Sequence, residues 1–260
     1  MLTLRKWERE LSSNQQSRER RAIITGGSSG IGLATASMMR EQGYSVVSVD
    51  LNPPGESDLS FVAGDVADES SVAGAVEEAA EMLGGIDVVV NSAGVSSGGS
   101  VEKNTDEEWM HSLNVNVVGI ARVTRNALPY LRAGANPVVV NLASIASHTG
   151  LPNRVLYGAT KGAVLSMTLA MATDYLSEGI RVNAVAPGTA DTPWVARLLA
   201  QADDPEEARR SLEARQPIGR LVTADEVALA ICYLADPRAA STTGTILDVD
   251  GGMHHLAPPR

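Results

Sequence analysis

The sequence predicts a single α/β domain, a doubly wound parallel sheet of seven strands with helices on both faces. Between residues 22 and 250, short runs rich in Val and Ile alternate with longer helical patterns. The runs show little polar alternation, as expected for strands that are covered on both faces. With 260 residues and 44% apolar composition, the chain is long enough to bury one large core.

Seven runs are predicted as strands, and five segments between them are predicted as helices. The strands are expected at residues 22–25, 44–50, 60–64, 86–91, 137–144, 180–186 and 245–250. The helices are expected at residues 30–42, 68–83, 105–132, 155–178 and 223–235, and a proline follows the last of them. This alternation is typical of a parallel sheet. Residues 190–220 interrupt it with a charged helical segment that has no strand, and we expect a lid there.

The bulk composition excludes several classes of partner. The net charge is −10 and no long basic run is present, which argues against nucleic acid or an anionic membrane as the main partner. We find no apolar stretch of about 18 residues and no signal-peptide pattern, so we expect a cytoplasmic protein with no membrane association. The single cysteine, Cys232, lies in an apolar helical pattern and is expected to be buried.

The first 20 residues differ in character from the rest of the chain. Through residue 21 they hold six Lys or Arg and three Glu, a net charge of +3 that leaves −13 for the remainder. We expect a flexible polar leader at 1–20 and the folded domain at 21–260. His111, His148, His254 and His255 show no metal-ligand spacing with acidic or cysteine residues, so no metal site is expected.

The stretch ITGGSSGIG, residues 24–32, leads from the first predicted strand through a glycine-rich turn into a helix. A dinucleotide-binding loop has this context, because the helix N-terminus then faces the phosphates. Gly26 would permit the tight turn, Gly30 the close approach of the backbone to pyrophosphate, and Gly32 the packing of the helix on the sheet. The alternative is a purely structural turn.

Asp50 ends the second predicted strand, twenty residues after Gly30. A carboxylate at this position accepts hydrogen bonds from the adenosine ribose hydroxyls and repels a 2′-phosphate. Neither Ser29 nor Leu51 supplies a compensating cation. The sequence therefore favours NAD over NADP, the alternative being an aspartate that simply faces water.

Tyr157 and Lys161 lie four residues apart in YGATK, on one face of a predicted helix. Lowering the pKa of a phenol from about 10 to about 7 requires roughly 4 kcal/mol. A fixed cation about 4 Å away supplies energy of that order at an effective dielectric of about 20. The pair is a candidate base with its activating cation, and the alternative is a surface tyrosine beside a solvated lysine.

The order and spacing of these motifs resemble the short-chain dehydrogenase/reductase family over about residues 20–253. The motifs are TGGSSGIG at 25–32, NSAG at 91–94, Asn116, Ser144 thirteen residues before Tyr157, YGATK, and PG at 187–188. The resemblance implies a Rossmann-like fold and an oxidoreductase that transfers a hydride between NAD(H) and an alcohol or carbonyl compound. Ser92 departs from the family's more usual asparagine but is also short and polar.

The resemblance also implies roles for individual residues. Tyr157 would be the general acid/base and Lys161 would lower its pKa and hold the nicotinamide ribose. Ser144 would orient the substrate oxygen, and Asn116 would anchor a water for proton relay. Cofactor contacts are implied, besides Tyr157 and Lys161, for residues that follow five of the strands: Gly26, Ser28, Ser29, Gly30, Ile31, Gly32, Asp50, Asp65, Val66, Asn91, Ala93, Gly94, Pro187, Gly188, Ala190 and Thr192.

The substrate is expected among the loops that follow the strands. By position, the residues that would bind it are Ser96, Ser144, His148, Asn153, Arg154, Tyr157 and Trp194. Several hydrogen-bonding groups and one flat apolar face suit a sugar or polyol, unless Asn153 and Arg154 face solvent. GTADTPW at 188–194 and the ending STTGTILDVDGGMHHL also resemble family members that oxidise L-fucose or L-rhamnose.

Other functions remain open at this point. A 3-oxoacyl reductase of fatty-acid synthesis would usually require NADPH, which Asp50 disfavours, and a hydroxysteroid-type dehydrogenase is a further alternative. A non-catalytic dinucleotide-binding regulator often lacks the Tyr-x-x-x-Lys pair that is present here. A sugar-nucleotide epimerase would need a C-terminal substrate domain, for which the chain has no room. The resemblance implies a homotetramer paired through helices 105–132 and 155–178 and the C-terminal strand.

Overall fold

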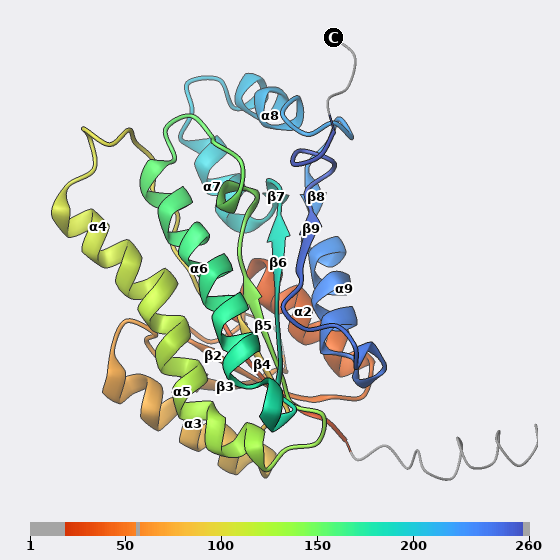
Figure 1. Cartoon of the computed structure of the whole chain (residues 1–260). Helices are drawn as coiled ribbons and strands as arrows, with labels where there is room; N and C mark the ends of the chain where they lie inside the picture. Colours follow the sequence, from red (N-terminus) through yellow and green to blue (C-terminus); the bar gives the residue numbers. More distant parts are fainter. Residues whose placement is uncertain (1–18, 56–57, 257–260) are drawn as a thin grey trace, which may run out of the picture.

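The computed structural model describes residues 19–55 and 58–256, and the predicted leader lies almost wholly outside them. Its centre is a parallel sheet with strand order β3-β2-β1-β4-β5-β6-β9 (Figure 1). The strands are β1 (Arg21–Thr25), β2 (Ser45–Asp50), β3 (Ser60–Ala63), β4 (Val88–Asn91), β5 (Val138–Leu142), β6 (Arg181–Pro187) and β9 (Ile246–Val249). The predicted doubly wound seven-stranded sheet is confirmed strand for strand.

Helices cover both faces of the sheet because successive residues of each strand point to opposite sides. Ile23 and Val89 pack in one hydrophobic cluster with residues of α3 and α5. Their neighbours Ile24 and Val88 pack in a second cluster with residues of α2 and α9. The helices are α2 (Gly30–Glu41), α3 (Glu69–Leu83), α5 (Gly119–Arg132), α6 (Val155–Asp174) and α9 (Ala224–Ala235).

The strand order fixes where a ligand can bind. From β1 the chain first adds β2 and β3 on one side, and then crosses to β4, β5 and β6 on the other. At such a switch point the connections leave in opposite directions, which opens a crevice outside the carboxyl ends of β1 and β4. The loops after these strands therefore form the expected site.

The predicted helix at residues 105–132 is divided in the structure. It consists of α4 (Asp106–Leu113), the π-helical turn η1 (Asn114–Val118) and α5. A π-helical turn widens the helix locally and is often found at functional sites. This turn contains Asn116, whose side chain is held inside the fold.

The segment 190–220 is helical as expected, but it begins with one short strand and is followed by another, neither of which was predicted. The order is β7 (Ala190–Asp191), α7 (Pro193–Ala200) and α8 (Pro205–Glu213), followed by β8 (Val222–Thr223), which pairs in parallel with β7. Buried Val195, Leu199 and Leu221 form a separate small core beneath this segment. In Figure 1, α7 and α8 lie beyond the carboxyl end of β6, where they can cover the site.

Helix α6 is long and apolar enough to cross a membrane by length and composition alone, so the expectation that the chain contains no such apolar stretch was wrong. In the fold, however, α6 packs along β6 and η1, and Val164 and Ala184 share one hydrophobic cluster. Its Lys161 is buried and donates to the carbonyl of Leu142 in β5. These contacts are those of a core helix in an α/β domain.

Candidate active site

A cavity of about 220 Å³ lies at the carboxyl end of the sheet and brings together three of the four predicted catalytic residues. Ser144, Tyr157 and Lys161 line it, although they come from the loop after β5 and from α6. Residues after β4 and β6 and from α7 complete the wall. The cavity thus occupies the crevice that the strand order predicts.

The Ser144 side chain is fixed by the turn that follows β5. Ser144 is the N-cap of the short 3₁₀ helix η2 (Ile145–Ser147), and its hydroxyl accepts from the backbone N–H of Ala146 at 3.2 Å. The Ser147 hydroxyl accepts in return from the Ser144 N–H at 3.2 Å. This reciprocal capping holds the Ser144 hydroxyl in the cavity wall.

Burial governs the ionisation of Tyr157 and Lys161. It raises the pKa of the Tyr157 phenol, and hydrogen bonding with Ser144 and the charge of Arg154 only partly offset this. Burial also lowers the pKa of Lys161 to about 8. The structure thus does not bear out the prediction that Lys161 lowers the pKa of Tyr157. The Lys161 ammonium is itself desolvated, donates to Leu142 O at 2.7 Å and lies 5.8 Å from the Tyr157 ring centroid.

Asn116 lies behind the cavity wall and connects three segments. Its Nδ2 donates to Val95 O at 2.8 Å and to Thr160 Oγ1 at 3.0 Å, and its Oδ1 accepts from the Val95 N–H at 2.8 Å. A Cβ built at Gly94 would lie 3.1 Å from Asn116 Oδ1 and 3.7 Å from Lys161 Nζ. Asn116 therefore holds the loop after β4 against α6, next to the lysine.

The glycine-rich loop requires glycine at the positions that the motif predicts. Gly26 has φ +67°, and a Cβ there would lie 2.9 Å from the Cα of Ala93. A Cβ at Gly32 would lie 2.1 Å from the Gly26 carbonyl oxygen. The first turn of α2, which follows the loop, carries no acidic side chain. The positive end of the helix dipole is thus available to an anionic group.

Asp50 ties the glycine-rich loop to the end of β2. Its Oδ2 accepts from the Ser28 N–H at 3.1 Å, and its Oδ1 accepts from the Leu51 N–H at 2.7 Å. The Ser28 hydroxyl is 3.0 Å from that of Ser48. The carboxylate is therefore oriented toward the same edge of the sheet as the loop.

The remaining residues of the predicted cofactor set follow the carboxyl ends of β3, β4 and β6. Asp65 Oδ1 accepts from the Ala67 N–H at 2.8 Å beside Val66, and the Ala93 N–H donates to Thr25 at 3.2 Å. Asn91 is buried and donates to Asn141 at 2.9 Å. The part of the set that lines the cavity comprises Ile31, Gly94, Pro187, Gly188, Ala190 and Thr192.

The predicted substrate residues divide into two groups. Ser96, Arg154 and Trp194 line the cavity with Ser144 and Tyr157, whereas His148 and Asn153 are not among its lining residues. His148 contacts Asp248 instead. Among the further lining residues that were not predicted are Leu151, Leu198, Leu212 and Arg215. Three of these residues come from the segment 190–220. In the sequence, only the position of this segment after the sixth strand indicated that it contributes to the site.

Buried Gln216 was also missed. Its Nε2 donates to Arg220 O at 2.7 Å and to Thr189 O at 3.2 Å, next to the Pro187-Gly188 turn. A Cβ at Gly188 would lie 2.3 Å from Gln216 Oε1. Gln216 thus fills the space beside Gly188 of the PG motif. The sequence predicts only that the segment around Gln216 is charged and helical.

Comparison with known proteins agrees with this geometry. Residues 26–254 match a family model described as enoyl-(acyl carrier protein) reductase. A cis-4-hydroxycyclohexanecarboxylate dehydrogenase of Sinomonas cyclohexanicum is 39% identical over 246 residues, which cover 90% of this chain and 96% of the relative. A 3-oxoacyl-(acyl-carrier-protein) reductase of Thermotoga maritima is 33% identical over 244 residues, which cover 89% of this chain and 96% of the relative.

A solved structure supports the same assignment. The aldohexose dehydrogenase of Thermoplasma acidophilum superimposes with a TM-score of 0.89 and 32% identity, over 94% of this chain and 97% of the other. The superposition covers nearly the whole of both chains. The chain therefore belongs to the short-chain dehydrogenase/reductase family and is an oxidoreductase that acts on CH–OH groups.

Proposed function

We propose that this protein is an NAD-dependent dehydrogenase that oxidises a secondary alcohol on a small, largely apolar and anionic molecule. The observation that carries the proposal is the lining of the cavity. Ser144 and Tyr157 share the cavity lining with Arg154, Lys161 and Arg215, and no residue that lines the described cavity carries a carboxylate. A cationic cavity in a chain of net charge −10 favours an anionic substrate over a neutral one.

The roles proposed for the residues follow from their positions. Tyr157 would accept the proton of the substrate hydroxyl, Ser144 would hydrogen-bond the same oxygen, and Asn116 would keep the loop after β4 and α6 in register beside Lys161. A bound nicotinamide dinucleotide would supply the hydride acceptor. Because burial raises the pKa of Tyr157, we expect oxidation to accelerate at alkaline pH, where the phenol loses its proton more readily.

The residues after β1 and β2 fit a dinucleotide. Gly30, with φ +53°, leaves its backbone open, since a Cβ there would meet only Thr192 at 3.7 Å, and the acid-free N-terminus of α2 suits a pyrophosphate. Asp50 would accept from the ribose hydroxyls and repel a 2′-phosphate, which supports NAD. Thr192, the N-cap of α7 in the cavity wall, would face the nicotinamide end.

For the substrate, cyclic hydroxycarboxylates are the class that the cavity fits best. Leu151, Trp194 and Leu198 offer an apolar surface for a ring, and Arg154 lies close enough to Tyr157 to influence its ionisation. A carboxylate bound by Arg154 would place a ring hydroxyl across the ring from it. The 39% identical relative is named for a hydroxycyclohexanecarboxylate, which supports the same class.

A neutral aldose is the second candidate. It is favoured by the likeness to an aldohexose dehydrogenase and by hydroxyl-bearing lining residues such as Ser96 and Thr189. Sugars bind best to sites that contain both donors and acceptors, and the lining offers hydroxyl groups and three cations but no carboxylate as a charged acceptor. Because another relative is named a 3-oxoacyl-(acyl-carrier-protein) reductase, hydroxyacyl thioesters are a third class of substrate to test.

The test is formation of reduced nicotinamide from NAD or NADP with hydroxycyclohexanecarboxylates, aldoses, polyols, hydroxyacyl thioesters and hydroxysteroids. We expect turnover of a hydroxycarboxylate with NAD, and a loss of about 10²–10⁴-fold in Tyr157→Phe. Arg154→Gln should raise KM by roughly tenfold or more with a smaller effect on kcat. Exposed Arg197, which is not among the lining residues, provides the matched control Arg197→Gln. Turnover of aldoses alone, with Arg154→Gln unchanged, would reject the anionic substrate class.

A further inference from the structure

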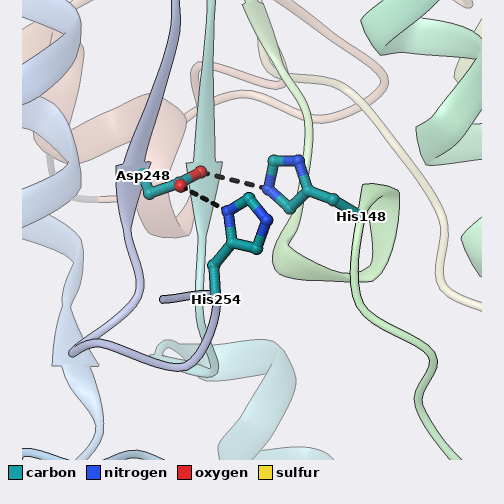
Figure 2. Close-up of side chains that lie close together, drawn as sticks. All are labelled: His148, Asp248 and His254. Atoms are coloured by element: carbon teal, nitrogen blue, oxygen red, sulfur yellow. Dashed lines mark hydrogen bonds and ion pairs between the residues drawn. The ribbon is translucent and has the colours of Figure 1, made fainter. Parts of the chain in front are cut away.

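Three of the four histidines in the chain gather around one carboxylate, outside the cavity described above. His148 Nε2 lies 3.1 Å from Asp248 Oδ1, and His254 Nδ1 lies 2.9 Å from Asp248 Oδ2 (Figure 2). His255 Nε2 lies 3.4 Å from Asp248 Oδ2. His148 and Asp248 are 100 residues apart in the chain, so the sequence alone did not indicate a metal site.

The local geometry leaves two polar atoms without a suitable partner. His148 Nε2 and Asp248 Oδ1 are both buried, and within the described part of the chain neither forms a hydrogen bond. Their 3.1 Å contact therefore lacks hydrogen-bond alignment. Buried polar atoms without a partner are costly, and a cation between them would satisfy both.

The fold holds the three side chains in place. Asp248 belongs to β9, beside Ala186 of β6, and His148 ends the 3₁₀ helix η2 that follows β5. Asp250 accepts from the N–H of Gly252 at 2.8 Å and from that of His254 at 2.7 Å, which folds the chain back after β9. Gly251 and Gly252, with φ +62° and +91°, allow this tight turn.

The ligand atoms lie close to the spacing of a metal site. The ligand atoms of His148, Asp248 and His254 all lie within 4.8 Å of one another. Tetrahedral zinc with bonds of about 2.0–2.1 Å separates its ligands by about 3.4 Å, so the ligand atoms must move closer together. The imidazole rings of His148 and His254 are stacked, with ring centroids 4.0 Å apart and an interplanar angle of 4°, so at least one ring must rotate for both nitrogens to point at one ion.

We propose that His148, Asp248 and His254 bind one divalent transition-metal ion, with Zn²⁺ as the best match. Two imidazoles and one carboxylate favour zinc over magnesium or calcium, which prefer oxygen ligands. His255, 3.9 Å from the His254 ring, is positioned to join the site from its more exposed side.

The ion would act as a structural clamp. It joins the loop that begins at Ser144 to the turn after β9, and His148 does not line the catalytic cavity. Because the unfolded chain separates His148 from the other two ligands by 100 residues or more, the ion binds the native state preferentially and stabilises it. This inference is independent of the proposed substrate.

The test is calorimetric titration of ZnCl₂ into the full chain, prepared without a histidine tag and stripped with a chelator. We expect one ion per chain and a Tm that rises with zinc concentration. His148→Gln and His254→Gln should each weaken binding by about tenfold or more and abolish the rise in Tm. His111→Gln, on the exposed surface of α4, removes the fourth histidine and should bind zinc like wild type.

A second readout separates loss of the site from loss of the fold. Co²⁺ gives visible absorption when imidazoles bind it in a tetrahedral site, and circular dichroism reports folding independently. One equivalent of cobalt should produce this absorption in wild type and His111→Gln, and should fail to produce it in a folded Asp248→Asn variant. Absence of saturable zinc binding by wild type, or unchanged binding in all three ligand variants, would overturn the proposal and leave a hydrogen-bonded cluster.

Discussion

At the scale of single residues, Asp50 has two tasks that can be separated by one substitution. Its carboxylate holds the Ser28 and Leu51 N–H groups, and its charge would exclude a 2′-phosphate. Asp50→Asn keeps an oxygen for one of these hydrogen bonds and removes the charge. We expect kcat/KM with NADP to rise relative to that with NAD by about tenfold, since one unit of repulsion is lost.

The control for this substitution is Glu78→Gln, which removes a charge from the exposed surface of α3. Its ratio of NADP to NAD efficiency should equal that of wild type at the same ionic strength. If Asp50→Asn loses activity with both cofactors equally, the carboxylate serves the loop alone and NAD preference has another origin.

Sequence could identify site residues whose spacing is local or belongs to a known motif. Tyr157 and Lys161 share a helix face by their four-residue spacing, and both do line the cavity. Arg215 and the pairing of His148 with Asp248 could not be found this way. They depend on how α8, η2 and β9 are placed in space, and no local period records that.

At the scale of elements, long buried strands and amphipathic helices were predictable, and short or irregular elements were not. All seven core strands were found because several apolar residues repeat in each. The two-residue strands β7 and β8 are too short to carry a pattern. The π-helical turn at Asn114–Val118 adds one residue to a helical turn, a local change that apolar periodicity does not resolve.

One buried ion pair joins three elements at the amino ends of their strands. Asp87, just before β4, accepts from the Arg21 N–H and side chain of β1 and from the Ala135 N–H before β5, at 2.8–3.1 Å. Asp87→Asn would leave the Arg21 charge buried without its counter-ion. We expect it to lower the free energy of unfolding by about 3–5 kcal/mol at pH 7, measured by urea denaturation.

The pH dependence of this loss has a definite sign. Burial raises the pKa of Asp87, but hydrogen bonds from Arg21 and Ala135 and the Arg21 charge outweigh it, so the pKa is lowered. The stabilisation is therefore complete above the unfolded pKa of about 3.9 and is lost as pH falls through the native pKa. The gap between wild type and Asp87→Asn should be constant from pH 7 to about 5 and narrow below about 4. A gap that stays constant to pH 3, or an equal loss in the exposed Asp58→Asn control, would contradict this assignment.

At the scale of the whole molecule, the fold could be predicted from the alternation of strands and helices. The assembly of subunits could not, because it depends on which helix faces remain exposed in the folded chain. Met110, Val118, Val155 and Leu169 are 42–67% exposed on α4, η1 and α6. The sequence could not separate these residues from the core, because a helix with apolar residues all round gives the same pattern in either setting. Figure 1 shows α4, α5 and α6 together as the outer layer of one face of the sheet.

We propose that this layer pairs two copies of the chain within a homotetramer, because water-exposed apolar side chains on neighbouring helices favour association. Light scattering coupled to size exclusion should then give a mass near four times 27.2 kDa. Leu169→Glu, which places a charge in the centre of the proposed contact, should shift the mass to a smaller species. Met82→Glu on α3, where Met82 is 53% exposed, should leave the mass unchanged. A monomeric wild type, or a Leu169→Glu variant of unaltered mass, would reject this surface as the subunit contact.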